Sequence, residues 1–152
     1  MGVEVGRFFN MYTVWNWFVV VAALLWKGPG RAALRQFAQG NSFVVLISIV
    51  WIYIIHGPGF FVRLMHHNIP GMSVPMTFVI DAVVHWLPVA LLGLPTVTNV
   101  YTFAPVVTLA AWYAANRKII GKIYMPAPTT DYDKIVVLAL LTYMVPMAWL
   151  GR

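Results

Sequence analysis

Asp81 and His85 stand four residues apart inside the apolar stretch 72–94. An ionisable group near the centre of a membrane costs about 2.5–3.5 kcal/mol on insertion scales, so such groups normally face the interior of a helix bundle and mark a site. The spacing places both side chains on one face of a helix. An aspartate there can accept the proton of one imidazole nitrogen and leave the other nitrogen as a base. A hydrogen bond that only ties helices together explains the same pattern, and both interpretations stay open.

A threonine and an asparagine, Thr13 and Asn16, share one face of the apolar stretch 8–26 because they are three residues apart. A threonine hydroxyl becomes a nucleophile when a base lies beside it. The alternative for Thr13 is a hydrogen bond to its own helix backbone, which is the usual role of threonine in membrane helices.

Three further histidines, His56, His66 and His67, do not predict a metal site. Adjacent histidines rarely bind one ion together, and no carboxylate lies near them in the sequence. The chain has no cysteine, which excludes disulfides and thiolate metal sites. No glycine-rich phosphate loop or metalloprotease motif is present, so we expect no cofactor.

The composition indicates where these side chains must be held. Of the 152 residues 61% are hydrophobic and 9% are charged, whereas a soluble domain carries roughly 25% charged residues. So few charges cannot cover a surface that faces water. Because a membrane-spanning helix needs about 20 apolar residues, the sequence predicts an all-α, multi-pass transmembrane helix bundle, with one domain over residues 1–152 and about five spans. Which membrane holds it stays open.

The expected spans follow from the apolar runs and from the helix breakers between them. A Gly-Pro-Gly sequence ends the first run at Gly28, and a second one at Gly57 predicts that the next helix stops at His56 or bends there. Asn41 and Ser42 are the expected N-cap of the second span, and the segment 63–71 is expected to be a loop. The five expected spans are 8–26, 41–61, 72–94, 99–116 and 134–150.

The formal charge is +6, and the basic residues are scattered between the apolar runs. We expect them to contact lipid headgroups or partner proteins. A nucleic-acid surface is not expected, because such a surface needs a dense basic stripe. Basic residues are nearly balanced between the two sides of a five-span chain, so the orientation stays open. The expected lipid- or partner-binding residues are Arg31, Arg35, Arg117, Lys118 and Lys122.

The order of these features resembles the androgen-induced-protein family of multi-pass membrane threonine hydrolases. The resemblance covers about residues 7–150, although the chain lacks the first span of that family. It rests on short motifs, which in chain order are Thr13 and Asn16, Trp51 and Tyr53, Asp81 with His85 and Pro88, Trp112 and Tyr113, and the loop Gly121-Lys122-Ile123-Tyr124-Met125-Pro126.

The resemblance implies an activity: that family cleaves fatty acid esters of hydroxy fatty acids with a threonine and a histidine. Thr13 would match the nucleophile and His85 the base. In the mechanism that the resemblance implies, Asn16 could donate to the oxyanion. Asp81 would match a position where relatives carry asparagine, and Ala82 replaces a histidine of the relatives. Tyr124 and Pro126 would match a Tyr-Pro pair, with Met125 inserted between them.

Two other functions stay open, so the sequence alone does not decide whether the chain is an enzyme. The first is a non-catalytic membrane subunit of a larger assembly, such as an organellar complex or the internal membrane of a large virus, because the chain has almost no mass outside the expected spans. The second is a small transporter or proton channel with Asp81 and His85 on its path. Five spans leave little room for the paired repeats that transporters use.

Overall fold

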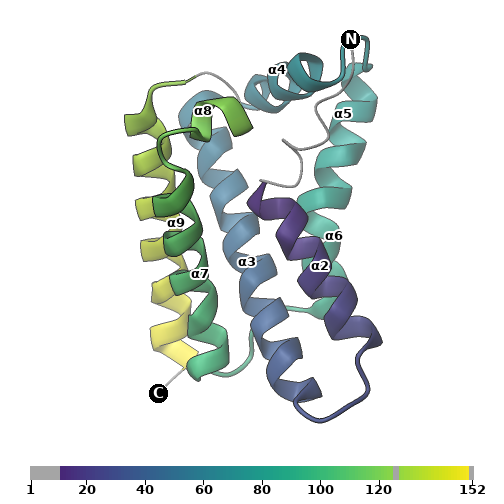
Figure 1. The fold of residues 1–152 in the computed structure, drawn as a ribbon, viewed down its shortest axis with the longest axis vertical. Coiled ribbons are helices and arrows are strands. Elements are labelled where there is room, and N and C mark those ends of the chain that lie inside the picture. The colour runs from purple at the N-terminus through teal and green to yellow at the C-terminus, as the bar shows by residue number, and fades with distance from the viewer. Residues whose placement is uncertain (1–10, 125–126, 151–152) are drawn as a thin grey trace.

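The computed structural model describes residues 11–124 and 127–150, and its regular secondary structure is entirely helical there, which confirms the all-α prediction (Figure 1). Residues 8–10 of the first expected span, Met125, Pro126 and the side chain of His67 lie outside the described residues. The elements are α2 (Tyr12–Leu25), α3 (Arg31–His56), α4 (Gly59–Asn68), α5 (Val74–Asp81), the π-helix η1 (Ala82–Trp86), α6 (Leu87–Leu92), α7 (Val100–Asn116), α8 (Ile120–Ile123) and α9 (Thr129–Leu150).

The long helix α3 is the centre of the bundle. It packs against α2, α7, α9, η1 and α6. Within an 18-residue apolar stretch of α3, 44% is buried, compared with 22% for the corresponding stretch of α9. Gly40 makes this crowding possible, because a Cβ there would lie 2.6 Å from the Tyr143 hydroxyl and 3.0 Å from Pro105. Three helices therefore meet at a residue without a side chain.

The predicted N-cap at Asn41 and Ser42 is wrong, because α3 already begins at Arg31. Gly30, at φ 79°, provides the turn before it. Both Asn41 and Ser42 lie inside the helix and are buried, and their side chains bond to a neighbouring helix instead of to their own backbone. Polar residues that cap helices in water can thus bridge helices in an apolar bundle.

The helix ends at His56, as the second Gly-Pro-Gly predicted. The loop expected at 63–71 is wrong in its first part, because α4 follows at once and lies across one end of the bundle (Figure 1). Its buried residues are Phe60, Phe61, Leu64 and Met65, whereas Arg63 and His66 are exposed. This amphipathic pattern explains why a short basic segment forms a helix here.

The third predicted span is one continuous helical stretch, formed by α5, η1 and α6. Ser73 caps its start by accepting a hydrogen bond from the Met76 backbone N–H. A π-helical turn at Ala82–Trp86 precedes Pro88, and the Leu87 N–H bonds to the Ala82 carbonyl five residues back. Pro88 lacks an N–H and its ring would crowd the carbonyl four residues before it, so a wider turn there relieves the conflict.

The last two long helices form a pair beside α3. Asn99 and Thr102 make a capping box at the start of α7. The segment 117–133, between the last two expected spans, contains the short helix α8. Helix α9 begins at Thr129, five residues before the expected 134. Its first turn carries Asp131, whose charge favours a helix N-terminus.

Three helical stretches are long and apolar enough to cross a membrane by length and composition: Arg31–His56, Val74–Leu92 and Thr129–Leu150. The shorter helix α2 is also apolar. Much of the outer surface is hydrophobic, and the exposed large hydrophobic residues of α9 are Val137, Leu141, Met144, Val145, Trp149 and Leu150. An apolar exterior of this extent is expected where lipid replaces water.

Candidate functional site

The acid–imidazole pair lies inside the bundle. His85 Nδ1 is 2.7 Å from Asp81 Oδ1 and 3.2 Å from the Asp81 carbonyl oxygen. Both side chains are buried, with 5% of each residue exposed. The contact occupies Nδ1 and leaves Nε2 as the nitrogen that Asp81 does not use.

The π-turn brings the two groups together. Asp81 is the last residue of α5, and His85 is the fourth residue of η1. A wider turn leaves backbone carbonyls without their usual partners, and π-bulges often occur at functional sites. The Phe61 ring, from α4, meets the imidazole edge to face at 5.6 Å and covers it. Two helices and the π-turn therefore fix the imidazole.

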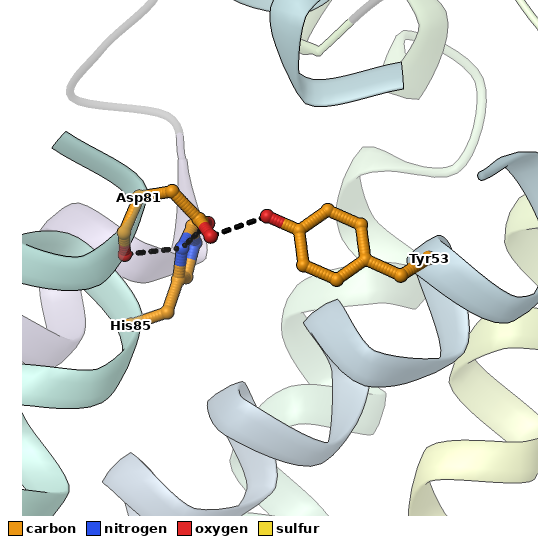
Figure 2. A network of polar contacts seen from close by, with 3 residues as sticks. All are labelled: Tyr53, Asp81 and His85. Atoms are coloured by element: carbon orange, nitrogen blue, oxygen red, sulfur yellow. Dashed lines mark hydrogen bonds and ion pairs between the residues drawn. The ribbon is translucent and has the colours of Figure 1, made fainter. Parts of the chain in front are cut away.

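Asp81 has a second partner, which the sequence did not reveal. Tyr53 of α3 donates its hydroxyl hydrogen to Asp81 Oδ2, and Figure 2 shows the carboxylate between the phenol and the imidazole. Tyr53 entered the sequence argument only as an aromatic residue of a span. A polar-tipped side chain in an apolar helix is a signal, but its partner depends on how α3 faces α5.

Thr13 and His85 line the same cavity, which has a volume of about 170 Å³. Thr13 is the second residue of α2, so the two residues reach the cavity from different elements. No hydrogen bond joins the described side chains of Thr13 and His85. The rest of the wall is mainly apolar and aromatic and includes Val45, Ile49, Phe60, Leu64, Trp112 and Tyr132.

Tyr124, the one member of the expected Tyr-Pro pair within the described residues, also lines this cavity. Its hydroxyl accepts a hydrogen bond of 3.3 Å from the Tyr12 backbone N–H at the start of α2. Burial raises the pKa of Tyr124 above its usual range, so this hydroxyl stays protonated near neutral pH.

Asn16 belongs to a different polar cluster. Its Oδ1 accepts hydrogen bonds from Asn41 Nδ2 at 2.8 Å and from Ser42 Oγ at 3.2 Å. The Tyr12 hydroxyl donates to Asn41 Oδ1 at 2.5 Å and lies 2.9 Å from Thr108 Oγ1. These five residues, called here the α2–α3–α7 tie, are Tyr12, Asn16, Asn41, Ser42 and Thr108.

Asn16 is fully buried and is not among the described residues that line the cavity. Its Nδ2 has no hydrogen-bond partner. The oxyanion role expected for Asn16 therefore stays a prediction, and it would need a rotation of this side chain toward the cavity.

The five expected lipid- or partner-binding residues are all exposed. Arg31 and Arg35 begin α3 at one end of the bundle, and Arg117, Lys118 and Lys122 lie near α8 at the other end (Figure 1). Arg117 is already engaged within the chain, because its Nε and Nη2 bond to the two oxygens of Asp133 at 2.8 and 2.7 Å. These bonds raise the pKa of Arg117 above its usual range.

The remaining described histidines lie apart from the cavity's acid–imidazole pair. His56 stacks on Phe60 at 4.9 Å and lies 4.0 Å from Asp131, and His66 Nε2 is 2.6 Å from the Met72 carbonyl oxygen. Within residues 11–124 and 127–150, no three His, Cys, Asp or Glu side chains are grouped as metal ligands would be. The structure thus offers one candidate centre for chemistry among these histidines, at His85.

The described chain is therefore an all-α bundle with three helices that could span a membrane, and with a buried Asp–His pair on an apolar cavity. Comparison with known proteins finds no matching protein family, no similar curated protein and no similar solved structure. The resemblance to the androgen-induced-protein family consequently stays a prediction from the motifs.

Proposed function

We propose that the chain is a multi-pass membrane hydrolase that cleaves lipid esters, with fatty acid esters of hydroxy fatty acids as the substrate class. The observation that carries this proposal is that Thr13 and His85 line one apolar cavity while Asp81 occupies the far nitrogen of the imidazole. A hydroxyl, a base and a group that orients the base are the parts that nucleophilic acyl transfer requires.

Five crossings are part of the proposal. Three helices are long enough to cross a membrane, and α2 and α7 would be the other two crossings. Both α2 and α7 pack against α3. At about 1.5 Å per residue, the 14 residues of α2 and the 17 residues of α7 span about 21 and 25 Å, somewhat less than the hydrocarbon core. Interfacial tryptophans such as Trp15 and Trp26 would then anchor α2.

In the first half-reaction, His85 Nε2 takes the proton of the Thr13 hydroxyl, and Thr13 Oγ attacks the ester carbonyl carbon. The tetrahedral intermediate collapses, the carbon–oxygen bond to the alcohol breaks, and the leaving oxygen takes the proton from His85. The products are a free hydroxy fatty acid and an acyl-threonine. Asp81 holds the ring and stabilises its cationic form during this step.

In the second half-reaction, His85 takes a proton from water, whose oxygen attacks the acyl-threonine. Release of the fatty acid returns the proton to Thr13 Oγ. The apolar walls suit the hydrocarbon chains of the substrate, and they also limit access of water, which strengthens the Asp81–His85 interaction.

The test is hydrolysis of such an ester by the purified chain in lipid vesicles. Thr13→Val and His85→Gln should each lower turnover by about 10³-fold or more, because each removes a group that takes part in bond making. The matched control is Thr108→Val, which removes a threonine hydroxyl from α7 that is not among the cavity-lining residues. Mass spectrometry of trapped protein should place an acyl group on Thr13. Turnover that survives both Thr13→Val and His85→Gln would reject the hydrolase.

A non-catalytic membrane subunit is the second candidate, and it is favoured by the absence of a hydrogen bond between the described Thr13 and His85 side chains. In that case the exposed basic residues at both ends, such as Arg35 and Lys122, would contact partner proteins or anionic lipid. Co-purification in a larger complex after gentle extraction, together with no ester hydrolysis, would support it. A monomer would count against it. Proton flux into vesicles that depends on His85 would instead support the channel.

A further inference from the structure

The carboxylate of Asp81 has two oxygens, and each one is held by a different part of the bundle. Oδ1 accepts from His85 Nδ1, which is four residues away in the same helical stretch. Oδ2 accepts from the hydroxyl of Tyr53, which belongs to α3 (Figure 2). Tyr53 is therefore the contact that links the acid–imidazole pair to the central helix by a hydrogen bond.

Tyr53 cannot act on a bound molecule directly. It is only partly buried and is not among the described residues that line the cavity, whereas His85 is. Any influence on chemistry at His85 must pass through Asp81. A residue in this position can fix the orientation of the carboxylate, because a carboxylate with one donor can turn around its terminal bond while one with two donors on opposite sides cannot.

Helix α3 is also connected to the segment that carries Thr13. Asn41 and Ser42 of α3 bond to Asn16 of α2, three residues after Thr13. Hydrogen bonds thus connect α3 to both sides of the site: to Asn16, near Thr13, and through Tyr53 and Asp81 to His85.

We propose that Tyr53 is a positioning residue for His85: its bond to Asp81 keeps the imidazole as one tautomer, with the proton on Nδ1 and Nε2 free to act as a base. The consequence for turnover rests on the proposed hydrolase function. A phenol suits this role because it is a neutral donor. A lysine or arginine would bring a positive charge that competes with His85 for the charge of Asp81.

The central variant is Tyr53→Phe, which keeps the ring and removes the donor. It should lower kcat by about tenfold or more and leave KM within about twofold. The nearest parallel is the outer hydrogen-bond partners of metal-binding histidines, which typically contribute about 10–100-fold. Tyr53→Met, which also lacks the hydroxyl, should give the same split between kcat and KM even if its packing changes stability.

Tyr143→Phe is the matched control. Its hydroxyl also bridges two helices, donating to the Thr102 carbonyl oxygen at 2.5 Å, and it is buried but not among the cavity-lining residues. Loss of that bond should lower stability and leave kcat within about twofold. If Tyr143→Phe lowered kcat as much as Tyr53→Phe, a general loss of rigidity would explain both, and the positioning role would be overturned.

A measurement that does not need activity completes the test. In ¹⁵N spectra of the full chain in detergent micelles, the His85 signals, assigned by their absence in His85→Gln, should show one tautomer in the wild type. Tyr53→Phe should give a mixture of tautomers, and Tyr143→Phe should not. A single unchanged tautomer in Tyr53→Phe would overturn the inference. A wild-type chain that cleaves no ester would reject the hydrolase instead, and the spectra would still decide whether Tyr53 fixes the imidazole.

Discussion

Two groups of polar side chains join helices of this bundle, and they differ in charge. The α2–α3–α7 tie is built from neutral amides and hydroxyls, and its members bond mainly to one another. The second group, Tyr53, Asp81 and His85, contains ionisable side chains, and its imidazole lines an apolar cavity. Both groups include α3, so their difference does not come from position in the bundle.

The difference shows how to separate structural from chemical polarity in an apolar interior. Neutral polar groups can be satisfied in pairs at modest cost and then hold helices together. An aspartate and a histidine are far more costly to bury, so their presence beside a cavity indicates a functional role. We therefore expect substitutions in the tie, apart from Asn16 with its predicted oxyanion role, to change stability alone. Substitutions in the acid–imidazole group should change turnover.

Among substitutions that leave both Thr13 and His85 in place, the largest effect is expected for Asp81→Asn. The amide keeps the shape but carries no charge and presents one acceptor where Tyr53 and His85 need two. Turnover should fall about 10²–10³-fold, because the imidazole loses the group that stabilises its cation. The control is Asp133→Asn, a carboxylate that also accepts from a tyrosine, at 2.6 Å, but is not among the cavity-lining residues. Equal turnover in Asp81→Asn and the wild type would remove the distinction between the two groups.

The next largest effect is expected at Gly40, beside the tie. A Cβ there would come within 2.6 Å of the Tyr143 hydroxyl and 3.1 Å of the Thr102 carbonyl oxygen. Gly40→Ala should lower the free energy of unfolding by about 1–3 kcal/mol, because α3, α7 and α9 must move apart. Unfolding by SDS in mixed micelles measures it. Gly59→Ala is the control, since the nearest atom there is the flexible end of Arg63 at 3.4 Å. Equal stabilities of the two variants would contradict the close approach.

Asn41→Leu should break the tie at its middle. Asn41 bonds to Asn16 on one side and to Tyr12 on the other, so the substitution removes two hydrogen bonds between α2 and α3. The free energy of unfolding should fall by about 1 kcal/mol, which is typical of interhelical hydrogen bonds in membranes. The kcat per folded molecule should stay within about twofold. A tenfold loss of kcat without a loss of stability would mean that the tie belongs to the site.

The smallest effect is expected for Thr108→Val. Thr108 is exposed and contributes one contact of 2.9 Å to the Tyr12 hydroxyl, which keeps its bond to Asn41. Stability should fall by about 0.5 kcal/mol. The same mixed-micelle titration checks it, and a loss larger than that of Asn41→Leu would show that the tie is centred on α7 instead of α3.

The sequence predicted the fold class and the Asp81–His85 contact because both follow from local rules. Low charge and long apolar runs require helices in lipid, and spacing of four residues brings two side chains of one helix together. The end of α3 at His56 could be predicted for the same reason, because a glycine at the following position, Gly57, is a local signal for the end of a helix.

The errors arose where tertiary contacts overrode local signals. Asn41 and Ser42 have the side chains of an N-cap, but hydrogen bonds to Asn16 offset the cost of burying them within α3. The role of Tyr53 could not be predicted, because it depends on which face of α3 meets α5. The shared cavity of Thr13 and His85 depends in the same way on packing between helices far apart in sequence.

The central place of α3 has a consequence for how the protein is made. This helix is the second of the described helices to leave the ribosome, and α5, α7 and α9 all follow it. Because the N-terminal part of a chain emerges first, η1, α6, α7 and α9 each find the surface against which they pack already synthesised. Assembly can therefore proceed in the order of translation, with α9 the last of the described helices to pack on α3.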